Sequence, residues 1–156
     1  MKKWLKSLLT VLILAAGLFV FVKISNFLFA PEEPVPAVEV RIAEDGFYDS
    51  RDDVALYIHT YNKLPSNFVT KKKAREMGWV ASKNNLRKVC KGCSIGGDIF
   101  TNEQEILPVK KGRKYYECDI DYDGGKRNEK RIVFSSDGLI FYTEDHYKSF
   151  IQLYGE

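Results

Sequence analysis

The sequence is poor in the residues that build metal centres, because its 156 residues include only two histidines and three cysteines. Cys90 and Cys93 form a CKGC motif, whereas Cys118 stands alone. A structural zinc site needs four ligands, so one CxxC motif is a weak zinc signal, and we predict no metal site. A disulfide between Cys90 and Cys93 is the preferred interpretation, with free thiols or a redox pair as alternatives. Cys118 is expected in the core.

An excess of charge of one sign is also missing. The chain has 24 Lys and Arg residues against 21 Asp and Glu residues, which leaves a net charge of +3. This balance neither requires nor excludes a nucleic-acid partner, so the placement of the charges must decide. The length allows one compact domain once a targeting segment is set aside, and leaves no room for two cores.

The long uncharged apolar run lies near the N-terminus, over Leu8–Val22, and lysines precede it. This pattern is typical of an export signal. Residues 1–30 are therefore a signal peptide or, if Lys23 reaches the membrane interface, an uncleaved membrane anchor. Residues 31–44 are proline-rich and favour an extended spacer, so we expect the folded domain over residues 45–156. The protein is predicted to be secreted or anchored to the outer face of the cytoplasmic membrane.

Helical patterns come first in the folded part of the chain. Apolar residues at helical spacing predict a helix over residues 49–64, then a second helix over 70–79 and a shorter third over 82–92. Thr70 is the expected N-cap of the second helix, and Gly78 provides its left-handed C-cap.

Strand patterns follow. The segments KYYECDIDY, RIVFSS and LIFYT alternate or run apolar, and the turn clusters DGGKRN and SDG join them as antiparallel neighbours. We therefore predict an α+β fold, with N-terminal helices packed on one face of a C-terminal antiparallel β-sheet. Cys118 and Ile120 share one face of the first strand, and Glu117, Asp119 and Asp121 share the other.

Polar groups are expected to converge on the open face of this sheet. Glu117 lies on the first strand, Arg127 follows the turn, Arg131 begins the second strand, and His146 follows the third. These elements are neighbours in a meander, so their side chains can form one site. The alternative is a solvated sheet face with cross-strand ion pairs.

These residue types match the requirements of RNA cleavage by the RNA's own 2′-hydroxyl. That reaction needs a base for the hydroxyl proton, an acid for the departing 5′-oxygen, and cations for the charge on phosphorus. A carboxylate and an imidazole supply the first two, and arginine forks suit phosphate. The reaction needs no metal and no cofactor.

From about residue 45 to the C-terminus the chain resembles the barnase family, the small secreted bacterial guanyl-specific ribonucleases. The resemblance rests on DGFYDSRDDVALYIHTYNKLPSNFVTKKKAREMGWVASKNNL, on CSIGGDIFTN, and on GRKYYECDIDYDGGKRNEKRIVFSSDGLIFYTEDHY. It implies the microbial ribonuclease fold and a family reaction that proceeds through a 2′,3′-cyclic phosphate.

The resemblance also implies roles for individual residues. It makes Glu117 the general base and His146 the general acid. Asp98 would hold the cationic cluster in place, and Tyr147 would contact the substrate beside the acid. The cations expected around the scissile phosphate are Lys71, Arg127 and Arg131.

The base-recognition loop departs from the family pattern. The family reads guanine with backbone amides and a glutamate in the segment that is FTNEQE here, in which Phe100, Thr101 and Asn102 keep or approximate the pattern. Gln104 replaces the guanine-binding glutamate and cannot accept two N–H bonds as a carboxylate does. Glu103 replaces an arginine and brings negative charge near the RNA. We therefore expect a relaxed guanine preference.

The predicted function is thus an exported, metal-independent endoribonuclease for single-stranded RNA. The alternative is a catalytically inactive RNA-binding or inhibitor-binding module of the same fold, although such a module would be expected to lose one of the catalytic groups. The resemblance further implies a small barstar-like inhibitor protein as partner. A monomer is expected, with membrane contact only through residues 1–30.

Overall fold

The structure is a computed structural model that describes residues 42–156. Residues 1–30, predicted to be a signal peptide or anchor, and most of the predicted spacer lie outside the described residues. Within residues 42–156, no helix has the length and apolarity needed to cross a membrane.

The three predicted helical segments are present but shorter than expected. Helix α2 spans Arg51–Tyr61, and the Ser50 hydroxyl caps it by accepting a 3.2 Å hydrogen bond from the Asp53 amide. Helix α3 spans Lys71–Glu76 behind its cap Thr70, and the chain leaves it through Gly78 at φ 94°. The third segment divides into a 3-10 turn, η1 at Ala81–Lys83, and a single helical turn, α4 at Leu86–Val89.

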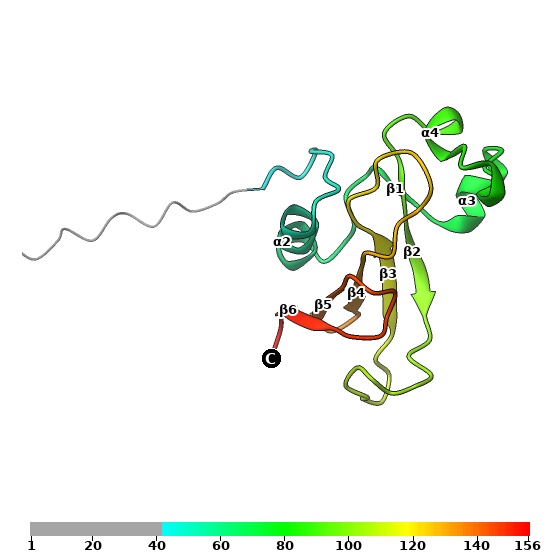
Figure 1. The fold of residues 1–156 in the computed structure, drawn as a ribbon. Coiled ribbons are helices and arrows are strands. Elements are labelled where there is room, and N and C mark those ends of the chain that lie inside the picture. The colour runs from blue at the N-terminus through cyan, green and yellow to red at the C-terminus, as the bar shows by residue number, and fades with distance from the viewer. Residues whose placement is uncertain (1–41) are drawn as a thin grey trace, which may run out of the picture. The chain divides into compact units, whose positions relative to one another are not determined.

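The strands form one six-stranded sheet in the order β1 to β6 (Figure 1). Strands β2 to β6 pair antiparallel, as predicted for β3 to β5, and the short β1 pairs parallel with β2. The sequence patterns identified β3, β4 and β5 but missed β1, β2 and β6. The bounds are β1 Phe68–Val69, β2 Ser94–Phe100, β3 Tyr115–Asp119, β4 Arg131–Ser135, β5 Ile140–Thr143 and β6 Ile151–Tyr154.

Strand β2 escaped prediction because two glycines interrupt its pattern. The register between β2 and β3 shifts between Gly96 and Asp98, as a β-bulge requires. A Cβ atom on Gly96 would lie 2.6 Å from the Cys118 side chain and 2.7 Å from that of Phe68. Glycine is therefore needed here for the close approach of β1, β2 and β3, which places Asp98 beside Glu117.

Apolar clusters pack on both faces of the sheet. Under α2, Val54, Ala55 and Ile58 contact buried residues that include Cys118 and Ile132. Around α3 and α4, a second cluster joins Ala74, Trp79, Leu86, Ile95 and Tyr122. The opposite face was expected to be polar, but a third cluster occupies part of it. Its members are Leu107, Tyr115, Val133, Leu139 and Phe141.

The cysteines differ in their surroundings. Cys90 and Cys93 form a disulfide that joins the end of α4 to the segment just before β2. Cys118 is a free thiol, 1% exposed, and its burial raises its pKa well above the ordinary value. It therefore serves as a core side chain rather than as a nucleophile.

Candidate active site

Glu117 stands on β3 with its carboxylate held from two sides. Oε1 accepts a 2.5 Å hydrogen bond from Nζ of Lys71, and Oε2 accepts one from the Tyr147 hydroxyl. Burial of Glu117 would raise its pKa, but the hydrogen bonds from Lys71 and Tyr147 and the charge of Arg131 together hold the pKa below its ordinary value. The carboxylate is thus kept ionised, as a general base must be.

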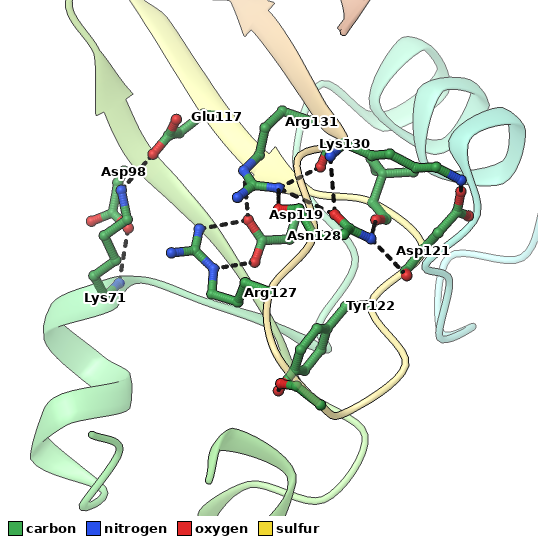
Figure 2. Close-up of polar contacts among 12 residues, drawn as sticks. Lys71, Asp98, Glu117, Asp119, Asp121, Tyr122, Arg127, Asn128, Lys130 and Arg131 are labelled. Atoms are coloured by element: carbon green, nitrogen blue, oxygen red, sulfur yellow. Dashed lines mark hydrogen bonds and ion pairs between the residues drawn. The ribbon is translucent and has the colours of Figure 1, made fainter. Parts of the chain in front are cut away.

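Lys71 is placed by the start of α3. Its backbone amide donates a 2.9 Å hydrogen bond to Oδ2 of Asp98, and Asp98 is the cross-strand partner of Glu117. Asp98 therefore fixes the first residue of the helix, from which the Lys71 ammonium reaches Glu117 (Figure 2).

The two arginines are held by Asp119 and not by Asp98. Nε and Nη2 of Arg127 donate to Oδ2 and Oδ1 of Asp119 at 2.5 and 2.7 Å, a bidentate pair. Nε of Arg131 lies 2.9 Å from Oδ1 of the same carboxylate. The side chains of Asp119 and Arg131 are only 2% and 4% exposed. Figure 2 shows both guanidiniums turned toward the Asp119 carboxylate. Asp98 was expected to hold the cationic cluster; its carboxylate accepts from the backbone amide of Lys71, whereas Asp119 pairs with both arginines.

Sequence reasoning missed Asp119 as a site residue. It was noted only as one of three carboxylates on a strand face. No local sequence signal marks it, because alternation along the strand places Asp119 on the polar face with Glu117, and its burial arises only when Arg127 and Arg131 pack against it.

His146 lies in a tight loop after β5. It has φ 58° and Tyr147 has φ 74°, and two successive residues in this left-handed region cost about 1–3 kcal/mol each. Asp145 supports this loop by accepting from the amides of Lys148 and Ser149 at 3.0 Å and from the Ser149 hydroxyl at 2.6 Å. These bonds, with the Ser149 hydroxyl contributing most, lower the pKa of Asp145 to about 2.

The loop brings His146 to the side of Glu117. The rings of His146 and Tyr147 have centroids 4.7 Å apart, and the Tyr147 hydroxyl bonds to Glu117. The His146 side chain is exposed, and no hydrogen bond to its ring forms within residues 42–156. The imidazole is therefore open to a ligand on the same face.

The predicted recognition loop follows β2 directly. Phe100 packs on Tyr147 with ring centroids 5.2 Å apart, which links this loop to the His146 loop. Asn102, at φ 45°, donates to the Leu107 carbonyl and accepts from the Leu107 amide at 2.9 and 3.0 Å. The side-chain amide of Asn102 therefore shapes the loop and is not free to bind a base. Thr101 and Gln104 are exposed.

A bidentate ion pair braces the far side of this loop. Arg113 makes a bidentate pair with Asp137 at 2.7 and 2.8 Å, and its Nη1 donates to the Pro108 carbonyl at 2.9 Å. The Tyr115 hydroxyl donates to the same carbonyl at 2.8 Å. The loop is thus fastened to β3 and to the β4–β5 turn.

Comparison with known proteins agrees with this fold. A family described as ribonuclease matches residues 51–154. A ribonuclease of Heyndrickxia coagulans is 50% identical over 102 residues, which cover 65% of this chain and 94% of that protein. A ribonuclease of Bacillus intermedius is also 50% identical over 102 residues, which cover 65% of this chain and 63% of that protein. Guanyl-specific ribonuclease St of Saccharopolyspora erythraea is 40% identical over 55 residues, or 35% of this chain and 54% of that one.

The α+β fold and these matches define an RNA-cleaving enzyme. The chain belongs to the barnase-like microbial ribonucleases.

We predict that Asp119→Asn destabilises the fold. Removing the charge leaves the buried Arg131 and the half-buried Arg127 beside a neutral amide, and breaking a buried ion pair costs about 3–5 kcal/mol. Urea unfolding measures this loss. The matched control is Asp121→Asn, because Asp121 makes one exposed pair with Lys130 at 2.7 Å and should cost at most about 1 kcal/mol. Equal losses in the two variants would show that Asp119 has no special role.

We also predict that Lys71→Gln narrows the pH range of activity. Without the ammonium the pKa of Glu117 rises, so the acid limb of kcat/KM moves to higher pH. Lys72→Gln is the control, because Lys72 is exposed and pairs with no carboxylate within residues 42–156. An acid limb at the same pH in both variants would contradict the assignment of Glu117 as the base.

Proposed function

We propose that this chain is an exported, metal-independent endoribonuclease that cleaves single-stranded RNA by transesterification. One arrangement carries the proposal. The ionised Glu117 carboxylate lies on the same strand face as Asp119, and Asp119 holds two arginines. Tyr147 links Glu117 to the loop that carries the exposed His146. A base, an acid and cations then surround one site, and each requirement of the reaction is met by a side chain of this chain.

In the first step Glu117 accepts the proton of the 2′-hydroxyl. The 2′-oxygen forms a bond to phosphorus, the bond from phosphorus to the 5′-oxygen breaks, and His146 gives that oxygen a proton. The products are a 2′,3′-cyclic phosphate and a free 5′-hydroxyl. In the second step the roles reverse. His146 accepts a proton from water as the water oxygen bonds to phosphorus, the bond from phosphorus to the 2′-oxygen breaks, and Glu117 returns its proton to that oxygen.

The arginines retain nitrogens for the phosphate. Arg127 uses Nε and Nη2 for Asp119, whereas Arg131 uses Nε for Asp119 and Nη1 for the carbonyls of Asn128 and Lys130 at 2.8 and 2.6 Å. Nη1 of Arg127 and Nη2 of Arg131 are therefore the donors expected to contact the phosphate oxygens. Because both guanidiniums are fixed before substrate binds, they stabilise the transition state with little reorganisation.

We further propose a guanine preference that is weaker than that of a site with a carboxylate at position 104. The loop after Phe100 offers backbone amides to the base, but Gln104 presents one acceptor and one donor. Export through residues 1–30 and control by a small inhibitor protein are part of the same proposal. They rest on the N-terminal sequence and on the family resemblance respectively.

The first test is incubation of residues 38–156 with a defined single-stranded RNA in the presence of a chelator. We expect 2′,3′-cyclic phosphate ends in the wild type and a rate loss of about 100- to 10,000-fold in Glu117→Ala and in His146→Ala. Mass spectrometry of the fragments identifies the ends. No cleavage by a wild type that binds the RNA would support an inactive binding module instead.

A second prediction concerns base choice. Gln104→Glu should restore a paired contact to guanine and raise the ratio of kcat/KM for guanosine over adenosine substrates by about tenfold or more. The control is Glu103→Gln, which removes a neighbouring charge and should change the salt dependence of KM without changing that ratio. A ratio that is unaffected by Gln104→Glu would remove position 104 from base recognition.

A further inference from the structure

The connection between β2 and β3 carries a basic run that the catalytic site does not use. It reads KKGRK, Lys110 to Lys114, and it leads directly into β3. Lys110 and Arg113 pair with Asp137, whereas Lys111 and Lys114 are exposed and pair with no carboxylate within residues 42–156. In Figure 1 this connection extends past the end of the sheet, away from α3 and α4.

Beside this run, an apolar and aromatic row crosses the sheet. Ile99 pairs with Tyr116 and Tyr116 pairs with Phe134 across β2, β3 and β4. Ile99 is 65% exposed, and the half-buried rings of Tyr116 and Phe134 have centroids 5.6 Å apart. Side chains alternate along a strand, so Tyr116 lies on the face opposite to Glu117.

The row borders a hollow beside α2, between that helix and the sheet. One side is lined by His59 of α2 and by Asn62, the C-cap of that helix. Another side is lined by Tyr116, Phe134 and Ser136. Gly138 also lines the hollow, and a Cβ atom there would meet nothing within 4 Å. His59 stacks on Tyr154 with ring centroids 4.3 Å apart. None of the lining residues is acidic.

The basic run, the row and the recognition loop are connected. Ile99, Thr101 and Asn102 line a second hollow together with Lys110 and Lys114, and Glu103 and Glu105 also line it. The Lys114 amide donates to the Ser136 hydroxyl at 3.1 Å, and the Ser136 amide donates to the Lys114 carbonyl at 2.8 Å. A continuous surface therefore leads from the recognition loop, past free lysines, to the aromatic hollow.

We propose that this surface is a second contact for single-stranded RNA, which takes nucleotides beyond the one that is cleaved. The proposal rests on the proposed function, since the ligand is the same RNA chain. Lys111 and Lys114 match the phosphate charge, and the half-buried rings of Tyr116 and Phe134 offer their accessible parts to unpaired bases, which stack on aromatic rings without regard to sequence. Asn62, His59 and Ser136 offer polar groups to base edges at the rim. The contact strengthens binding of long RNA and leaves the chemical step unchanged.

The test compares two substrates, guanylyl-3′,5′-uridine and a 20-nucleotide RNA with a single guanosine. The charge variant is Lys111→Gln with Lys114→Gln, and the plug variant is Ser136→Trp, which fills the hollow from its exposed rim. The matched control is Lys88→Gln with Lys91→Gln, two exposed lysines beyond this surface that pair with no carboxylate within residues 42–156.

We expect kcat/KM for the 20-nucleotide RNA to fall about 3- to 10-fold in the charge and plug variants, while the dinucleotide value stays within about twofold. The control should change neither value. Equal losses on both substrates, or no loss on the long RNA, would overturn the proposal. The proposal would also be overturned if the charge variant kept its kcat/KM for the long RNA but lost binding to phosphatidylserine vesicles, because the basic run would then contact lipid.

A binding measurement separates this proposal from the proposed reaction. His146→Ala is titrated with a 2′-O-methyl oligonucleotide, and amide chemical shifts are followed by NMR. We expect shifts at Tyr116, Phe134 and His59 as well as around Glu117, and Ser136→Trp should remove only the first set. Shifts confined to the Glu117 face would exclude the second contact, whether or not the wild type cleaves RNA.

Discussion

The buried carboxylate of Asp119 is the group on which the site depends. It lies at the end of β3, almost without exposure, and it binds guanidiniums from the following loop and from β4. Two cations near one another repel, and arginines beside a phosphate site would turn outward without a shared anion. Asp119 therefore fixes the distance between the cations and also joins β3 to the loop that carries Arg127.

Glu117 and His146 are positioned by different means. Glu117 takes its place from a rigid strand and from its hydrogen bonds to Lys71 and Tyr147. His146 depends on a loop with two residues in the left-handed region, and Asp145 offsets the cost of that conformation with its hydrogen bonds. The proposed base thus stands on a strand of the sheet, whereas the proposed acid stands in the loop after β5, which Tyr147 links to Glu117.

Much of this arrangement could be predicted from the sequence, because local signals were strong. The caps and apolar spacing predicted α2 and α3, and the turn clusters predicted β3 to β5. Strand β2 was missed because a bulge at Gly96 and Asp98 breaks its pattern. Strand β1 has only two residues, and β6 has no buried residue to give it an apolar face. The apolar cluster around Leu107 was missed as well, because its members come together only when the loop after β2 folds back on β3.

The central claim is that the RNA's own 2′-hydroxyl, activated by Glu117, attacks the phosphate. The most direct measurement replaces the single guanosine of a short RNA with its 2′-O-methyl analogue and follows cleavage at that position. We predict that cleavage at the modified guanosine disappears, while an unmodified guanosine elsewhere in the same RNA is still cut. Continued cleavage after the modified guanosine would contradict it, because water would then be the attacking group.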